Sequence, residues 1–287
     1  MQYLIVITLL WAFSFSLIGE FLAGRVDAWF SVLMRIALAL LVFLPFMRLR
    51  STPKPLALKL MGIGAVQLGM MYGFYYQSFL HLSVPEVLLF TVMTPIYVSL
   101  LNDAFDLKFH AKYLLAAVIA TLGAVAIRFN GISSDFLLGL LMVQCANLCF
   151  AFGQVAYKRL MQHQSLPQQQ VFGWFFVGAL LVAITTWLLW GNPAKLPQTS
   201  TQWGILIYLG LIASGLGYFG WNKGATLVNV GALAVMNNLL IPAGIVVNLL
   251  IWNRDADVLR LSIGAALILM ALLLNQYLDK SRKPATD

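Results

Sequence analysis

Charged residues are scarce in this sequence. They make up 10% of the 287 residues, whereas a soluble domain has about 25%. Hydrophobic residues make up 61%, and apolar runs of about twenty residues, the length that crosses a bilayer, recur along the chain. No polar segment is long enough to form a soluble domain. The composition therefore predicts an all-α integral membrane protein surrounded by lipid.

Cysteines and enzyme signatures are also few or missing. Cys145 and Cys149 lie four residues apart inside one apolar run, so neither a disulfide framework nor a zinc site is indicated. The sequence contains no H-E-x-x-H, no G-x-S-x-G and no P-loop. The three histidines lie near predicted loops without a ligand spacing. We therefore expect no cofactor, no metal, no direct use of ATP and no enzymatic activity.

Acidic residues are outnumbered by basic ones, which gives a net charge of +8. In a membrane protein such a surplus marks cytoplasmic loops, so nucleic acid is not an expected partner. With the N-terminus inside, the outer connections carry five basic residues, Arg25, Arg128, Lys195, Arg254 and Arg260. The inner connections carry twelve, namely Arg48, Arg50, Lys54, Lys59, Lys108, Lys112, Lys158, Arg159, Lys223, Lys280, Arg282 and Lys283. Both termini are therefore expected in the cytoplasm.

Ten apolar stretches are long enough to span the membrane. They cover residues 2–22, 28–47, 58–80, 84–104, 112–129, 136–157, 171–190, 203–223, 231–252 and 259–277. The first stretch lacks a basic n-region and a cleavage site, so it is interpreted as a span and not as a signal peptide.

The second half of the sequence echoes the first at a constant offset. Gly73, Ser83 and Pro95 correspond to Gly220, Val230 and Pro242. Five spans in each half require opposite insertion, so we predict two inverted repeats, residues 1–130 and 131–287. A proline inside a span frees a backbone carbonyl, and matching interruptions in two halves indicate the binding region of a transporter. The alternative is that both prolines are ordinary packing kinks.

Arg35 lies near the middle of the second predicted span. A central arginine costs about 2.5–3.5 kcal/mol on insertion scales, so it should face the protein interior and have a partner. One interpretation is a guanidinium that receives a substrate carboxylate. The other is a structural ion pair, or a cap on the carbonyls of a broken helix.

Further polar and aromatic side chains are predicted near the interface of the two repeats. They are Trp11, Tyr76, Tyr97, Asn147, Trp221, Asn237 and Asn238. Each by itself can be an interhelical hydrogen bond or a packing residue; together they suggest a cavity for a small, partly apolar solute. Glu86 and Glu20 each have two interpretations, a cap at a helix terminus, or a carboxylate that couples transport to protons or pairs with Arg35.

Short strings in this sequence resemble a known family. The string Trp11-Ala12-Phe13-Ser14, with Arg35 in the second span, is similar to the EamA-type drug/metabolite transporter superfamily. The strings at 86–92 and 157–161 and Met236-Asn237-Asn238 resemble the biotin importers of its carboxylate/amino acid/amine branch. The resemblance implies a single-chain secondary carrier, expected to be monomeric, that takes up biotin across the bacterial inner membrane by alternating access.

The resemblance also implies roles for the candidate residues. Arg35 would pair with the biotin carboxylate. The ureido ring would face amide and hydroxyl groups, from Asn147, Asn237, Asn238 or Tyr76. The apolar ring would lie on Trp11, Tyr97 or Trp221.

Two other functions remain open at this point. The same fold supports export of amino acids or other amphipathic metabolites, since a fold alone does not decide function. A membrane enzyme acting on lipids would need paired acids or histidines at the interface, and the acidic residues show no such pairing.

Overall fold

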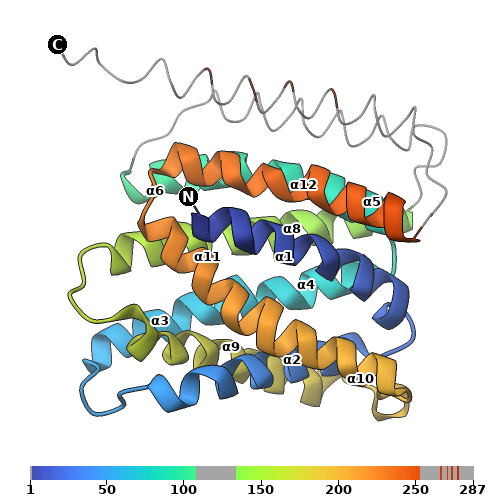
Figure 1. The fold of residues 1–287 in the computed structure, drawn as a ribbon, viewed down its shortest axis with the longest axis horizontal. Helices are drawn as coiled ribbons and strands as arrows, with labels where there is room; N and C mark the ends of the chain where they lie inside the picture. Colours follow the sequence, from blue (N-terminus) through green and yellow to red (C-terminus); the bar gives the residue numbers. More distant parts are fainter. Residues whose placement is uncertain are drawn as a thin grey trace.

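The computed structural model describes residues 2–107 and 134–252, together with positions 266, 270, 273 and 277. The described ranges are helical and contain no β-strand. Figure 1 shows the helices lying alongside one another, with their connections at two opposite ends. This arrangement places polar loops at two faces and helix sides between them.

Seven helical segments in the described ranges are long and apolar enough to cross a membrane. They are α1–η1 (Gln2–Leu17, Ile18–Leu22), α2–η2 (Ala28–Phe43, Leu44–Phe46), α3–η3–α4 (Lys54–Gly64, Ala65–Met70, Met71–Ser78), α5–η4–α6 (Val84–Phe90, Thr91–Met93, Thr94–Phe105), α8 (Ser134–Met161), α9 (Gln168–Trp190) and α10–η6–α11 (Ser200–Ile207, Tyr208–Leu216, Gly217–Thr226). A further helix, α12 (Val230–Trp252), lies where the ninth span is predicted, and η5 (Pro193–Lys195) precedes α10. The span predicted at 112–129 and most of that at 259–277 lie outside the described residues.

The break predicted at Pro95 is present. The 3-10 segment η4 separates α5 from α6, and Pro95 lies in the first turn of α6, where its missing N–H is not needed. The corresponding break predicted at Pro242 is wrong, because α12 runs as one helix through that position. A membrane helix can keep a proline where neighbouring groups satisfy the freed carbonyl.

Three of the spans contain π-helical turns, at η1, η3 and η6. Such turns are rare in helices and frequent at functional sites. Here η3 contributes Gln67 and η6 contributes Ser214, and both side chains are buried. The hydropathy pattern gives no signal for them.

Helices α3 and α9 meet backbone to backbone. A Cβ at Gly64 would collide with the backbone of Phe175, and a Cβ at Gly178 would collide with the backbone of Met61. Small residues at such a crossing allow the close approach on which membrane helix packing depends. By contrast, a Cβ at Gly62 would meet nothing within 4 Å.

A glycine-rich stretch of α11 and its preceding turn packs against α1. Gly215, Gly217 and Gly220 have the G-x-G-x-x-G spacing, but they lie within a membrane helix and do not follow a strand. A Cβ at Gly217 would lie 2.7 Å from Nε1 of Trp11, and one at Gly220 would lie 3.0 Å from Ile7. The spacing therefore serves helix packing and not phosphate binding.

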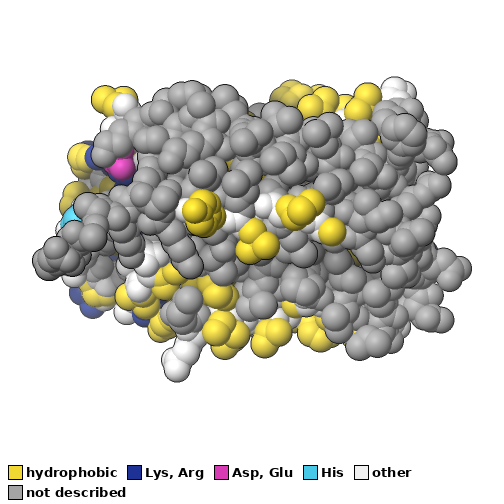
Figure 2. All heavy atoms as spheres, turned by 90° about the horizontal axis from the view of Figure 1, so that it is seen from above, with side chains coloured by type: hydrophobic (Ala, Val, Ile, Leu, Met, Phe, Trp, Pro, Cys, Tyr) yellow, Lys and Arg dark blue, Asp and Glu magenta, His cyan; other side chains and the backbone are white. Residues whose placement is uncertain are grey.

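The two ends of the described part differ in charge. Arg48 lies at one end, together with Lys158 and Arg159 in the last turn of α8. There Arg159 pairs with Asp106 at 2.8 Å, and Arg48 N donates to Gln170 O. At the opposite end, Asp27 N donates a hydrogen bond to Lys195 O. Figure 2 shows the visible charged side chains gathered at one end, while the other described side chains on that face are mostly hydrophobic. This distribution suits a molecule with its sides in lipid.

Candidate functional site

Arg35 lies in the middle of α2 and is only 3% exposed. Its three nitrogens each donate a hydrogen bond to a neutral hydroxyl. Nε donates to Ser214 Oγ at 3.1 Å, Nη1 to Tyr76 Oη at 3.0 Å, and Nη2 to Tyr72 Oη at 2.6 Å. The Tyr72 and Ser214 hydroxyls are also hydrogen bonded to each other, at 2.8 Å. The guanidinium is therefore held in a fixed orientation by α4 and η6.

This cation has no acidic partner in the described part of the chain. No carboxylate there lies within 4.0 Å of its nitrogens, so the ion-pair interpretation finds no support among these residues. The guanidinium carbon lies 4.2 Å from the Tyr72 ring centroid and 5.6 Å from that of Tyr76, which adds cation–π attraction. Dipoles and rings stabilise the charge without neutralising it, as an anion-binding group requires.

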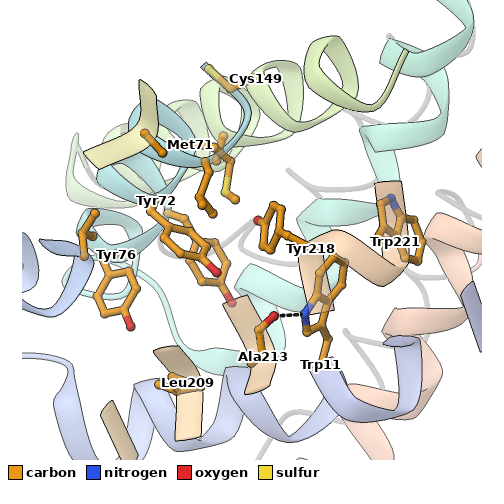
Figure 3. Packing of buried hydrophobic residues seen from close by; sticks show 14 of the residues in the cluster. Trp11, Met71, Tyr72, Tyr76, Cys149, Leu209, Ala213, Tyr218 and Trp221 are labelled. Carbon is orange, nitrogen blue, oxygen red and sulfur yellow. Dashed lines mark hydrogen bonds between the residues drawn. The ribbon is translucent and has the colours of Figure 1, made fainter. Parts of the chain in front are cut away.

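A cavity borders Arg35. Its wall combines aromatic rings with a few polar groups, the composition typical of small-molecule sites. The lining residues are Trp11, Ser14, Phe15, Ile18, Arg35, Met71, Tyr72, Tyr75, Thr91, Thr94, Ala146, Asn147, Phe150, Tyr218, Asn237 and Leu240. They come from α1, η1, α2, α4, η4, α6, α8, α11 and α12. Figure 3 shows Trp11, Tyr72 and Tyr218 gathered within this region.

Trp11 forms one wall of the cavity. Its Nε1 donates a 2.7 Å hydrogen bond to Ala213 O, drawn in Figure 3. Its ring centroid lies 5.1 Å from those of both Tyr218 and Trp221. Trp221 is 1% exposed and lies behind this wall, because it is absent from the cavity lining. Trp11 therefore reaches the cavity, whereas Trp221 supports it.

Asn147 donates a hydrogen bond to the backbone at the helix break that precedes Pro95. Its Nδ2 donates to Phe90 O at 2.9 Å and to Gln144 Oε1 at 3.1 Å. Phe90 is the last residue of α5, so Asn147 supplies a side-chain donor at the point where the α-helical hydrogen bonding is interrupted. Tyr97 donates to the same Gln144 oxygen at 3.2 Å but does not line the cavity.

Asn237 belongs to a buried amide network. Its Nδ2 donates to Gln154 Oε1 at 3.1 Å and to Leu233 O at 2.8 Å, while its Oδ1 accepts from Gln154 Nε2 at 3.3 Å. Trp221 Nε1 donates to the same Gln154 oxygen at 3.1 Å. Asn237 also lines the cavity. The side chain of Asn238 lies outside the described residues.

The remaining candidates lie away from the cavity lining. Oε2 of Glu86 accepts from the N and Oγ of Ser83, both at 2.8 Å, which forms the capping box that begins α5. Glu20 lies in η1 and is half-buried. Tyr76 binds Arg35 but lines a second pocket, near Asp27 and Trp190.

Several residues of the site were not among the candidates from the sequence. Tyr72 precedes Tyr76 by four residues, a spacing that places both on one helix face, and this signal was available. Tyr75 was available as part of the same aromatic run. Ser14 and Ser214 gave no signal, because single serines in apolar helices are usually packing residues.

Comparison with known families defines the class of protein. The model of the EamA-like transporter family matches residues 1–129 and 137–277. The chain belongs to this family of transporters. With seven candidate membrane helices in its described part, it is a multi-pass membrane protein.

Two named proteins and one solved structure are similar to this chain over nearly its whole length. The chain is 53% identical over 278 residues to a Pseudomonas aeruginosa protein named "Probable biotin transporter", covering 96% of this chain and 97% of that one. It is 48% identical over 273 residues to the "Biotin transporter" of Escherichia coli K12, covering 95% and 91%. A solved crystal structure shares the fold, with a TM-score of 0.67 at 17% identity over 96% of each chain.

Proposed function

We propose that this chain takes up biotin across the bacterial inner membrane. The observation that carries the proposal is Arg35, a buried cation that borders an aromatic cavity without an acidic partner in the described ranges. Biotin is a carboxylate with an apolar ring and a cyclic urea. The relatives named biotin transporters support this choice of substrate.

The carboxylate would bind the guanidinium. An arginine carries five N–H donors, and three of them are engaged with Ser214, Tyr76 and Tyr72. A buried carboxylate needs a paired charge and further hydrogen bonds to offset its desolvation. Arg35 supplies the charge, and its other two donors suit a carboxylate oxygen. The rings of Trp11 and Tyr218, which line the cavity with centroids 5.1 Å apart, would cover the apolar part of the ligand.

Transport would proceed by alternating access between the repeats at 1–130 and 131–287. Two separate matches to one family model, at 1–129 and 137–277, support this division. Arg35 and Tyr72, from the first half, bind Ser214 of the second half. A carboxylate bound by the other two donors of Arg35 would lie next to this contact between the halves. Substrate binding would thereby be linked to the contact between the halves, which is the link that a carrier requires.

The proposal includes an orientation and a monomeric state. The end that carries Arg48, Lys158 and Arg159 would face the cytoplasm, as the basic-residue rule favours. Lys158 Nζ donates to Val228 O, just after α11, and Lys223 Nζ of α11 lies 5.3 Å from the Tyr3 ring, so the first residues of the chain lie at this same end. Both halves are in one chain, so one copy can complete the site. Labelling of single cysteines at Arg50 and Lys195 from each side of the membrane tests the orientation.

Uptake of labelled biotin by a biotin-requiring strain tests the function. Expression of the chain should restore accumulation and growth on trace biotin. Protein present in the membrane without uptake would contradict import, and loss of solute from preloaded cells would then favour the exporter alternative.

A second experiment tests whether transport is coupled to protons through Glu86 or Glu20. Uptake is repeated with a proton uncoupler, and with the Glu86→Gln and Glu20→Gln variants. Glutamine at position 86 retains an oxygen that can cap α5.

A further inference from the structure

The amides in the cavity have few donors left for a ligand. Both hydrogens of Asn147 Nδ2 are donated, to Phe90 O and Gln144 Oε1, and both of Asn237 Nδ2 are donated, to Gln154 Oε1 and Leu233 O. Asn147 Oδ1 accepts no hydrogen bond within the described ranges. These side chains can therefore accept from the N–H groups of a ligand, but they cannot donate to its carbonyl.

Two hydroxyls in the cavity lining still have a hydrogen to donate. Ser14 is 5% exposed and Tyr75 is 7% exposed, and the hydroxyl oxygen of each is buried without a hydrogen-bond partner in the described part of the chain. Ser14 comes from α1 and Tyr75 from α4, and these two helices touch, because the Phe15 ring of α1 packs edge-on against Tyr75 with the ring centroids 5.3 Å apart. An unpaired buried polar group costs free energy and is rare in folded proteins. Both residues line the same cavity as Arg35.

We infer that the Ser14 and Tyr75 hydroxyls donate hydrogen bonds to a neutral carbonyl of the substrate. This inference rests on the proposed function and assigns the carbonyl of the cyclic urea to these two donors. The urea N–H groups then face an acceptor such as Asn147 Oδ1, while the carboxylate is left to Arg35. The two ends of the ligand are thus recognised by different residues.

The test compares ligands that differ only at this carbonyl. In 2-iminobiotin the urea oxygen is replaced by nitrogen, and the protonated group cannot accept a hydrogen bond. Uptake of labelled biotin by the wild-type protein should be inhibited far more strongly by unlabelled biotin than by 2-iminobiotin. Tyr75→Phe and Ser14→Ala should each raise the KM for biotin roughly three- to tenfold. Inhibition by 2-iminobiotin should stay within about twofold of wild type, because it never used these donors.

Ser16→Ala is the matched control. Within the described ranges the Ser16 hydroxyl is also buried without a hydrogen-bond partner, but Ser16 does not line the cavity. Its removal should therefore leave the KM for biotin and the inhibition by 2-iminobiotin unchanged. Membrane abundance of every variant is measured alongside. The inference would be overturned if a variant weakened inhibition by biotin and by 2-iminobiotin to the same extent, or if both variants kept the wild-type KM for biotin. Either result would leave the proposed function standing. Absence of biotin uptake by the wild-type protein would remove the proposed function, and this inference with it.

Discussion

The hydroxyl of Tyr72 accepts a 2.6 Å hydrogen bond from Nη2 of Arg35, and the Tyr72 ring centroid lies 4.2 Å from the guanidinium carbon. One side chain thus stabilises the cation through both its dipole and its π face. Neither interaction neutralises the charge, whereas a carboxylate in the same place would. We interpret Tyr72 as the residue that makes a buried arginine tolerable while keeping it available to an anion.

Replacement of Arg35 should abolish high-affinity uptake. Hydrogen bonds to charged groups contribute about 1.5–3 kcal/mol, so Arg35→Ala should raise the KM for biotin roughly tenfold to a hundredfold. Arg35→Lys keeps the charge but loses the planar fork, and should give an intermediate value. Uptake kinetics and membrane abundance are measured together, with Arg50→Ala in the exposed loop as control. A parallel loss of abundance and uptake would instead show a structural role for Arg35.

The two contributions of Tyr72 can be separated. Tyr72→Phe removes the hydroxyl that binds Arg35 and Ser214 but keeps the ring. Tyr72→Leu removes both. We expect uptake to fall a few-fold in the first variant and further in the second, because a desolvated cation–π contact contributes up to about 2 kcal/mol. Equal uptake by the two variants would mean that the ring contributes nothing.

Asn237 and Trp221 should differ in their effects. Asn237 lines the cavity, whereas Trp221 lies behind Trp11, and both bind Gln154 Oε1. Asn237→Ala should raise the half-saturating biotin concentration. Trp221→Phe should mainly lower the thermal stability of the detergent-purified protein, because its loss leaves a buried acceptor with one partner fewer, at a cost of about 1 kcal/mol. Unchanged binding by Asn237→Ala would remove α12 from the site.

The close crossing of α3 and α9 predicts a position-specific effect of alanine. Gly64→Ala forces a Cβ into the backbone of Phe175, so membrane abundance and thermal stability should fall, with a cost of about 1–3 kcal/mol as in other overpacked interiors. Gly62→Ala, two residues away on the same helix, enters open space and should be neutral. Similar behaviour of the two variants would contradict the observed packing.

Hydropathy located the spans that fall in the described ranges, because the thickness of a bilayer imposes a similar length on every crossing helix. The first predicted span, 2–22, matches α1–η1 as observed, and the span at 136–157 was too short, since α8 extends from Ser134 to Met161. Pro95 breaks its helix but position 242 does not interrupt α12. A proline signals a possible break, and the neighbouring helices decide whether one forms.

The sequence by itself determined that this chain is helical, that it crosses a membrane several times, and that Arg35 is an interior residue, because a charge in lipid is costly wherever the helix lies. Only the tertiary structure decided what surrounds that charge. Arg35 and Ser214 are 179 residues apart in the chain, and Trp11 and Ala213 are 202 apart. Contacts at such separations depend on the rotation and crossing of packed helices, which a pattern of apolar residues does not specify.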